Sequence, residues 1–297
     1  MAITLFTNSS AMSASNALQK ANSTLSTAME HLGTGKRITK ASDDAAGLQV
    51  ATRLQGQTNG MAVAQRNIAD ASTMLQTGEG AMDEVSNIMY RMKDLATQGA
   101  TDTNTADSRK AIDTEMGSLK TELNSIMGNT SYAGNKLFSD TKDASGTVTS
   151  KAKMGAEMTF QTGSESGETT KVDVSSQLSN VFSSINTLST ASVQDSTDGK
   201  TSGTTNANAL IDTLNSALDN VSSLRSSFGA SINGLSHASA NLTNMKDNTD
   251  QALGNIQDAD FASEASKMTR SQMLAQTSTS MLKQSNSMSS LVMSILG

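Results

Sequence analysis

Apolar residues recur every seven positions at the start of the chain. Leu18, Leu25 and Leu32 mark this repeat, and alanines at 14, 21 and 28 occupy the complementary positions. A seven-residue repeat of apolar side chains is typical of a helix that packs along a narrow seam. Glycines at 33 and 35 follow the last leucine and predict the end of this helix, because glycine readily adopts the left-handed conformation that closes many helices.

A longer repeat follows, from about residue 43 to residue 97. Seven consecutive heptads predict a helix of coiled-coil length. Ser42 or Asp43 is the expected cap, and Asp43 and Asp44 add negative charge where the helix dipole favours it. The heptad positions are Leu54, Met61, Ile68, Leu75, Met82, Met89 and Ala96. A further apolar face predicts a shorter third helix over residues 112–126.

The middle of the chain changes its period. Residues 157–162 and 169–174 alternate between apolar and polar, which predicts two strands joined by a loop at 163–167. Residues 194–208 are rich in serine, threonine and glycine and are expected to form a loop. Heptads then resume at Leu214, Val221, Phe228, Leu235 and Leu242. A break near Asp258 precedes a last helix, whose repeat is Leu274, Met281, Met288 and Ile295, with Leu291 beside it.

These elements predict a mainly α fold. The N- and C-terminal halves are expected to form an antiparallel bundle of long coiled-coil helices, with a small β-hairpin insert. Residues 1–42 and 258–297 are the expected inner terminal-helix domain, residues 43–138 and 175–257 the long-helix domain, and residues 139–174 its hairpin insert. The expected helix seam within the chain consists of Leu54, Met61, Ile68, Leu75, Val221, Phe228, Leu235 and Leu242.

The terminal helices have little to cover their apolar stripes within one molecule. Hydrophobic residues make up 36% of the chain, below the roughly 45–50% typical of globular domains. Isolated amphipathic helices are marginal in water. We therefore expect residues 2–35 and 261–297 to be poorly ordered in the free monomer and to fold on assembly. The expected contacts between subunits are Leu18, Leu25, Leu32, Leu274, Met281, Met288, Leu291 and Ile295.

Composition argues against several classes of function. The net charge of −6, from 22 basic and 28 acidic residues, is unlike the basic surface that nucleic-acid binding requires. The chain has no cysteine, so it has neither a disulfide nor a thiolate nucleophile. It contains no apolar run long enough to insert into a membrane, and residues 1–10 lack the features of a secretory signal.

Candidate catalytic and metal-binding residues are few. Asp43 and Asp44 are adjacent carboxylates, which can form an acid/base pair or stabilise the start of a helix. No His, Lys or Ser constellation converges on them, so we interpret them as helix-start residues. His31 and His237 have no second ligand at helical spacing. The sequence therefore indicates a structural protein, not an enzyme, with no metal and no cofactor.

Several segments resemble the bacterial flagellin family. Residues 32–38 (LGTGKRI) lead into residues 40–47 (KASDDAAG), which are similar to the DDAAG signature of flagellins. Residues 256–264 (IQDADFASE) are similar to a conserved C-terminal flagellin segment. The resemblance covers roughly residues 1–140 and 205–297. It departs from the family pattern at Gly33, where flagellins have serine, and at the C-terminus, which lacks the usual basic residue.

This resemblance implies a subunit that self-assembles into the helical flagellar filament for swimming or swarming motility. It implies a near-minimal flagellin with little or no outer domain. It also implies an extracellular location, reached through the flagellar type III apparatus without a cleaved signal peptide. The implied partners are further copies of the chain, the flagellar cap and hook–filament junction proteins, and an export chaperone at the C-terminal helix. Neither nucleic acid nor membrane insertion is expected.

Other interpretations stay open. A hook–filament junction protein of the flagellum is the main alternative, whereas a lytic variant would need a His-Glu cluster and a free coiled-coil scaffold would lack the signature segments. The resemblance also implies contacts with a vertebrate innate immune receptor at Arg91, Leu95 and Glu115, residues that can equally serve subunit contacts. The Ser/Thr-rich segments 139–150 and 189–205 are either O-glycosylated or plain solvated loops.

Overall fold

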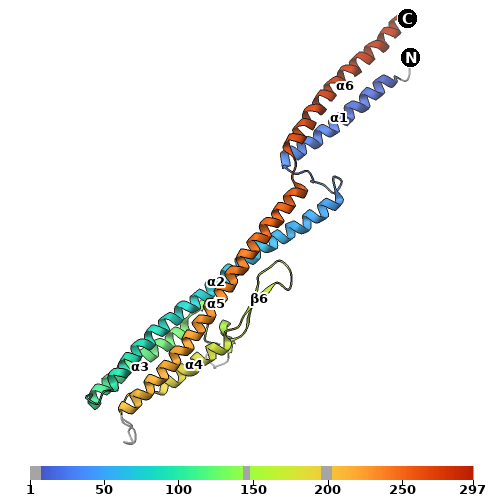
Figure 1. Cartoon of the computed structure of the whole chain (residues 1–297). Coiled ribbons are helices and arrows are strands. Elements are labelled where there is room, and N and C mark those ends of the chain that lie inside the picture. Colours follow the sequence, from blue (N-terminus) through green and yellow to red (C-terminus); the bar gives the residue numbers. More distant parts are fainter. Residues whose placement is uncertain (1–7, 143–147, 195–202, 297) are drawn as a thin grey trace. The chain divides into compact units, whose positions relative to one another are not determined.

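The computed structural model describes residues 8–142, 148–194 and 203–296, with side chains over residues 8–140, 151–194 and 203–288. Over these residues the fold is mainly α, as predicted, and the strands form short hairpins (Figure 1). Much of the two Ser/Thr-rich segments lies outside these ranges, so the glycosylation hypothesis stays a prediction.

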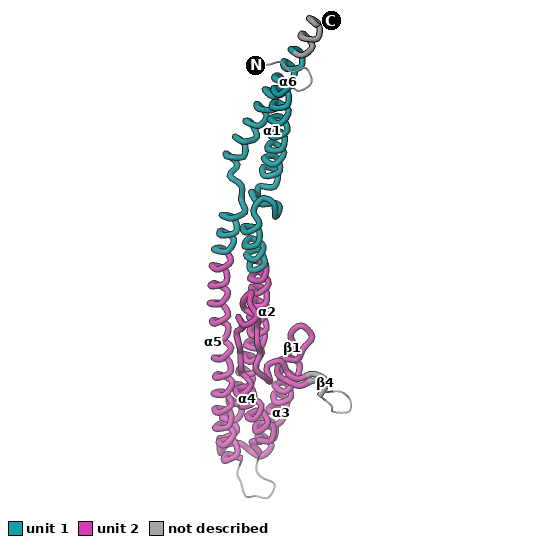
Figure 2. The backbone as a smooth tube through the Cα atoms, turned by 90° about the vertical axis from the view of Figure 1, so that its right-hand side faces the viewer, with its two compact units in different colours: residues 1–58, 247–297 teal, residues 59–246 magenta. Residues whose placement is uncertain are grey.

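The chain divides into two compact units (Figure 2). Unit 1 contains residues 1–58 and 247–297, and unit 2 contains residues 59–246. The long helices α2 (Ala45–Gly99) and α5 (Gly203–Gln257) each have residues in both units. The three-part domain division suggested by the sequence stays a prediction.

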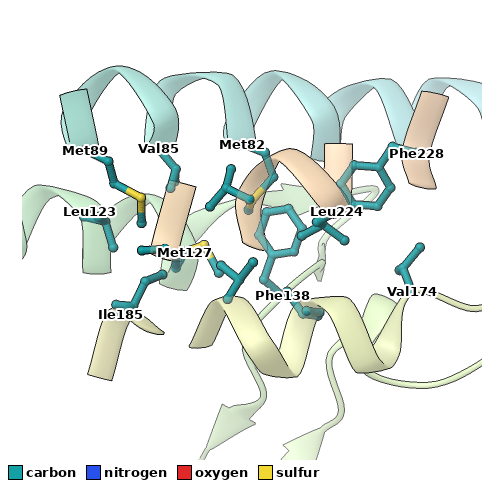
Figure 3. Close-up of a cluster of buried hydrophobic side chains, with 14 of the residues drawn as sticks. Met82, Val85, Met89, Leu123, Met127, Phe138, Val174, Ile185, Leu224 and Phe228 are labelled. Atoms are coloured by element: carbon teal, nitrogen blue, oxygen red, sulfur yellow. The ribbon is translucent and has the colours of Figure 1, made fainter. Parts of the chain in front are cut away.

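Unit 2 is a bundle in which α2 and α5 pack with α3 (Ala106–Asn129) and α4 (Ser175–Thr190) around one apolar core (Figures 1 and 3). The buried positions on the two long helices follow the heptad. Residues seven apart lie on the same side of a helix, and in α2 and α5 that side faces the partner helices. Fully buried examples are Leu75, Met82, Met89, Met92, Leu214, Val221 and Phe228. The predicted packing of the long helices against each other is therefore confirmed.

Polar contacts tie α2 to α5 beside this core. Arg225 on α5 donates to Glu79 at 2.7 Å and lies 2.9 Å from Asp83. Further along, the Gln65 amide donates to the Thr243 hydroxyl at 3.0 Å. These contacts are partly exposed, so each adds little free energy, but together they favour one register of the two helices.

The predicted hairpin is present in unit 2. Strand β5 (Met158–Gln161) pairs antiparallel with β6 (Thr169–Val172). The Asn67 amide on α2 donates to the Gln161 carbonyl at 3.3 Å, which anchors the hairpin on that helix. Two shorter hairpins precede it, between β1 (Ser131–Tyr132) and β2 (Asn135–Lys136) and between β3 (Thr141–Lys142) and β4 (Val148–Ser150), and a 3₁₀ turn, η1 (Lys153–Gly155), precedes β5.

Two parts of the middle region differ from the sequence prediction. The prediction of a loop at 194–208 is wrong over its last residues, because α5 already begins at Gly203. Ala207 and Leu210 are buried in the core and extend the apolar repeat of this helix. Helix α4 was not predicted, although it has a clear apolar face. That face consists of Leu178, Val181, Ile185 and Leu188, spaced by three and four as a helix requires.

Candidate functional site

The terminal helices α1 (Ser9–Thr34) and α6 (Phe261–Leu296) pair with each other in unit 1 (Figure 1). The pair is antiparallel, because the start of each helix lies beside the far part of the other. The Asn8 amide donates to Ser285 Oγ at 2.8 Å, and His31 Nδ1 lies 3.6 Å from Glu264 Oε1. Asn8 also caps α1, since its side-chain oxygen accepts from the Ala11 N–H.

The face of α1 toward α6 is narrow and made of alanines and leucines. Ala21 and Ala28 are buried, and Leu18, Leu25 and Leu32 are half-buried between and beyond them. Their spacing of three and four places all five on one stripe of the helix. In the single chain these leucines therefore line the seam with α6, and their assignment to subunit contacts stays a prediction.

The face of α6 toward α1 is largely polar, which the sequence analysis missed. Its less exposed positions repeat by four and three: Glu264, Met268, Ser271, Ala275, Ser278, Leu282 and Ser285. Glu264, Ser271 and Ser278 are the buried members of this set. The serines of this face remove little apolar area from water, so they add less to the stability of the helix pair than apolar residues at the same positions would. The heptad of serines was readable in the sequence, but apolar periodicity alone does not find it.

The apolar repeat of α6 lies off this seam. Leu274, Met281 and Met288 are each more than half exposed, and so is Met273. Leu291 and Ile295, which continue the predicted repeat, lie outside the described side chains. The single chain thus turns serines toward its own α1 and leaves the large apolar residues of α6 in water, where a contiguous stripe is typical of an interaction surface.

A shallow groove runs along the edge of the helix pair beside this stripe. It consists of two adjoining hollows of ≈ 410 and ≈ 380 Å³ that share Ala17 and Ser278. Mostly small residues line it on the α1 side, and Leu274 and Met281 stand on the α6 side. Lys20, Lys267 and Arg270 add basic side chains to the second hollow. We call this surface, Ala14, Ala17, Ala21, Leu274 and Met281, the edge groove. The small residues on its α1 side leave room for the side-chain ridge of another helix.

The two signature segments that lie far apart in the sequence meet in unit 1. Gly35 closes α1 with a φ of 72°, a conformation that glycine adopts without strain. The Ala259 N–H donates to the Gly35 carbonyl at 2.9 Å, and the Arg37 N–H donates to Gln257 at 2.7 Å. Lys36 and Asp258 form an antiparallel bridge between these bonds. The helix ends at the second of the two glycines that predicted its end, since α1 continues through Thr34 and Gly35 caps it.

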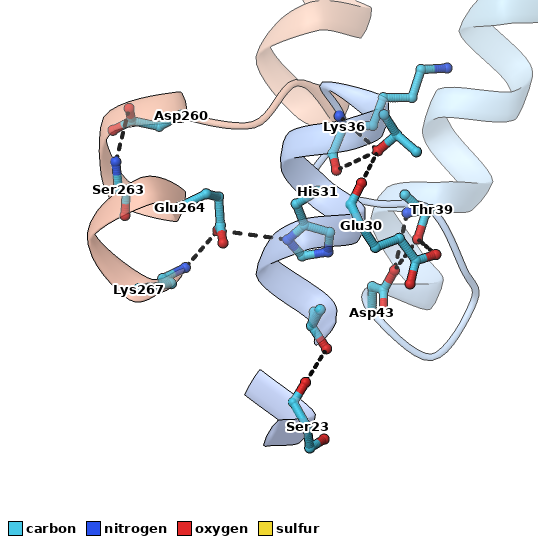
Figure 4. Close-up of polar contacts among 12 residues, drawn as sticks. Ser23, Glu30, His31, Lys36, Thr39, Asp43, Asp260, Ser263, Glu264 and Lys267 are labelled. Carbon is cyan, nitrogen blue, oxygen red and sulfur yellow. Dashed lines mark hydrogen bonds and ion pairs between the residues drawn. The ribbon is translucent and has the colours of Figure 1, made fainter. Parts of the chain in front are cut away.

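The DDAAG signature has a structural explanation. Asp43 Oδ2 accepts hydrogen bonds from the backbone N–H groups of Thr39 and Lys40 (Figure 4). The bond from Lys40 has the larger effect and the bond from Thr39 the next, and both hold the pKa of Asp43 below its ordinary value. Asp44 caps α2, because its Oδ1 accepts from the Gly47 N–H at 2.9 Å. The cap is thus Asp44 and not Ser42 or Asp43. Both carboxylates are engaged in backbone contacts, which fits the helix-start interpretation.

A second polar cluster joins α6 to α1 (Figure 4). Glu264 accepts from Lys267 at 2.7 Å, and this bond, with a smaller contribution from His31, lowers the Glu264 pKa. His31 Nδ1 is buried and is too far from Glu264 for a hydrogen bond. Among the described residues, no three His, Cys, Asp or Glu side chains are grouped closely enough to hold a metal ion.

The remaining predicted residues lie as follows. Leu54 is half-buried, and the other members of the seam expected within the chain are buried: Met61, Ile68, Leu75, Val221, Phe228, Leu235 and Leu242. Arg91 and Glu115 come together across α2 and α3, with the guanidinium donating at 2.6 Å and both side chains about half exposed. Leu95 has only 2% of its surface exposed, so the free chain does not present it beside them.

The chain is similar to known flagellar proteins over most of its length. The chain matches the model of the bacterial flagellin N-terminal helical region over residues 5–143 and that of the C-terminal helical region over residues 211–296. It is 32% identical to Flagellin A of Vibrio anguillarum, in an alignment that covers all of both chains. The chain belongs to the bacterial flagellin family.

Other relatives agree. This flagellin is 36% identical to a flagellin of Halalkalibacterium halodurans, over 91% of this chain and 90% of that one. A flagellar hook-associated protein of Vibrio parahaemolyticus shares the fold, with a TM-score of 0.55 at 20% identity, over 73% of this chain and all of that one. The crystal structure of Bacillus cereus flagellin is 30% identical, with a TM-score of 0.45, and covers 60% of this chain and 88% of its own.

Flagellins are structural proteins, and this flagellin is a subunit of the extracellular, self-polymerised flagellar filament. The hook–filament junction alternative is not favoured, because the relatives aligned over the full chain are named as flagellins. Only residues 144–210 separate the two matched regions, which is consistent with a minimal form. None of the described helices has the length and hydropathy needed to cross a bilayer.

Proposed function

We propose that this flagellin polymerises by burying the edge groove and the exposed stripe of α6 against helices of neighbouring copies. The observation that supports this proposal is the placement of Leu274, Met281 and Met288 in water, while serines occupy the seam with α1. The arrangement is unfavourable for a chain that remains single. It becomes favourable when a second chain covers the stripe.

The free energy available is modest for each contact and large for the polymer. Complete burial of a Leu or Met side chain contributes about 1.5–3 kcal/mol. Because about half of each stripe side chain is already covered, each contributes roughly 1 kcal/mol on assembly. A helical polymer repeats head-to-tail contacts without closing, so every subunit gains them with several neighbours.

A groove-filling substitution tests the proposal. Ala17→Gln puts a longer polar side chain into the edge groove and leaves the seam residues unchanged, so we expect helical monomers that do not polymerise. Ala111→Gln makes the same change at an exposed position of α3 and is expected to polymerise normally. Sedimentation and electron microscopy of the purified chains give the readout. Wild-type yields of long tubes from Ala17→Gln would overturn the proposal.

We extend the proposal to partners of the family. The flagellar cap and the hook–filament junction proteins are expected to meet the same α1–α6 surfaces at the ends of the filament. An export chaperone is expected to cover the stripe of α6 before export, since an exposed stripe in the cell invites aggregation. Co-purification of wild-type chain and of the Ala17→Gln and Leu274→Ser variants with each partner tests these contacts.

The innate-receptor hypothesis has partial support. The exposed Arg91–Glu115 pair forms a charged patch on α2 and α3, whereas Leu95 is buried. We propose that Arg91 and Glu115 make the contact in the free monomer. Signalling that is unchanged by Arg91→Ala would contradict this assignment.

Two further points complete the proposal. The chain is proposed to carry no catalytic activity, in keeping with its structural family. It is also proposed to leave the cell without removal of an N-terminal segment, which N-terminal sequencing of filament protein from culture checks.

A further inference from the structure

All the sulfur of this chain is in methionine, because it has 18 methionines and no cysteine. These methionines divide sharply by exposure. Eight are buried, and all of them belong to unit 2: Met61, Met74, Met82, Met89, Met92, Met116, Met127 and Met154. Six are exposed: Met12, Met29, Met245, Met273, Met281 and Met288. Met158 and Met268 are half-buried, and Met1 and Met293 lie outside the described side chains.

Five of the six exposed methionines are on the terminal helices. Met12 and Met29 are on α1, and Met273, Met281 and Met288 are on α6, with exposed fractions of 57%, 61% and 55% for the three on α6. Met281 is also part of the edge groove. The sixth, Met245, is on α5 in unit 2. The thioethers that solvent reaches are thus concentrated on the terminal helices, and three of the six are on α6, which carries the stripe proposed to assemble.

Exposure decides how readily a methionine is oxidised, and oxidation changes the side chain from apolar to polar. The sulfur attacks one oxygen of hydrogen peroxide, the O–O bond breaks, and the products are the sulfoxide and water. Sulfur loses two electrons and the peroxide gains them. Because the exposed side chains contribute little to the fold, the sulfoxide is tolerated in the monomer. Burying it between subunits without a hydrogen-bond partner is unfavourable.

We infer that Met273, Met281 and Met288 form a peroxide-sensitive modification site that controls assembly. This inference rests on the proposed function. Oxidation of the free chain to the sulfoxides blocks polymerisation, whereas assembly covers the same sulfurs and protects them. Thiol-dependent methionine sulfoxide reductases, one for each sulfoxide epimer, reverse the block.

The first test measures oxidation alone. Monomer and preformed filament are treated with hydrogen peroxide, and sulfoxide formation at each methionine is followed by peptide mass spectrometry. We expect Met281 and Met288 to be oxidised several-fold faster than Met82 and Met89 in the monomer, and several-fold more slowly in the filament than in the monomer. Equal rates at Met281 and Met288 in monomer and filament would contradict the inference.

The second test measures assembly. A Met273→Leu, Met281→Leu, Met288→Leu variant keeps the apolar stripe at nearly constant volume. After peroxide treatment we expect this variant to polymerise, and wild-type and Met245→Leu chains to fail until both reductases are added. Wild-type chain that carries sulfoxide at Met281 and Met288 and still polymerises would overturn the inference. A block that persists in the triple variant would also overturn it, because the sensitive group then lies elsewhere.

The two proposals fail in different ways. If the edge groove is not an assembly surface, unoxidised Ala17→Gln polymerises. If only the oxidation inference is wrong, unoxidised Ala17→Gln stays monomeric while oxidised wild-type chain forms tubes. Circular dichroism of the oxidised monomer checks that its helices remain. Loss of helix together with loss of polymerisation would contradict the inference that oxidation acts on the exposed stripe of α6.

Discussion

The guanidinium of Arg37 donates a hydrogen bond of 2.9 Å to the backbone carbonyl of Ile256, a residue 219 positions later in the chain. Together with the bond from the Arg37 N–H to Gln257, it joins the turn after α1 to the last turn of α5. Two segments that look like separate sequence signatures are therefore one structural element. A change in either segment is expected to affect the other.

Arg37→Ala removes the side-chain bond and leaves the backbone bond to Gln257. We expect a loss of about 0.5–1.5 kcal/mol in local stability, typical of one hydrogen bond. Hydrogen exchange of the Ala259 amide, which is bonded to Gly35, is expected to become several-fold faster. Arg53→Ala, an exposed change on α2, serves as the control, and an equal effect there would contradict the prediction.

Gly47→Ala is expected to destabilise unit 1. A Cβ atom at this position would lie 2.5 Å from Asp44 Oδ2 and 2.7 Å from Ile38 Cδ1, so the cap and the buried Ile38 would both have to move. We expect a loss of about 1–3 kcal/mol. Gly56→Ala is the matched control in the same helix: its Cβ meets nothing within 4 Å, and it is expected to stabilise by about 0.5–1 kcal/mol. Thermal unfolding of both variants measures the difference.

Acid is expected to loosen unit 1. Glu264 and Asp43 have pKa values lowered in the folded chain, by hydrogen bonds from Lys267 and from the Lys40 and Thr39 N–H groups respectively. A lowered carboxylate pKa contributes stability that is fully present above the ordinary values of 4.5 and 3.8. That stability is lost as pH falls through the lowered values.

Glu264→Gln is the test of this pH dependence. We expect hydrogen exchange in α1 and α6 to depend less steeply on pH below about 4.5 in the variant than in the wild type. Glu122→Gln, on the exposed side of α3, is the control and should keep the wild-type slope. An unchanged slope in Glu264→Gln would show that this carboxylate is not involved.

Removal of residues 281–297 deletes Met281 and Met288 of the exposed stripe and the end of α6. We expect the truncated chain to form no filaments, because the stripe is too short to hold neighbours. The unit 2 core contains no residue of α6, so its cooperative unfolding should be retained. Calorimetry and electron microscopy on the same sample separate these outcomes, and tubes formed by the truncated chain would refute the assembly mechanism.

Arg91→Ala and Leu95→Ala are expected to differ in stability. The exposed pair between Arg91 and Glu115 contributes less than about 1 kcal/mol. Leu95 is fully packed, and its truncation is expected to cost about 2–5 kcal/mol. Urea unfolding of both variants measures this difference. A receptor assay on Leu95→Ala therefore reports on contact only at a temperature where the variant is shown to be folded.

The heptad of leucines and methionines determined much of the fold in advance. A repeat sustained over a helix of 55 residues has one way to remove its stripe from water, which is to pack on a second such helix, and α5 carries that repeat. The hairpin of β5 and β6 was predictable for a similar reason, because alternation of period two fits only a half-buried strand. Helix α4 was not predicted because it is short and its four apolar face residues are separated in the sequence by serines and other polar residues.

The sequence by itself determined every helix except α4, the β5–β6 hairpin, the family resemblance and the absence of a cysteine. Only the tertiary structure decided which side of α6 faces α1. Apolar periodicity predicted Leu274 and Met281 as contacts between subunits, but it did not say which residues of α6 would face α1. The chain places Ser271 and Ser278 there and leaves the apolar side exposed. The reason is geometric: small residues let the two helices approach closely, and the large side chains of α6 remain exposed. The period of the apolar residues predicts that a helix has an apolar stripe. Which helix covers that stripe depends on the tertiary structure.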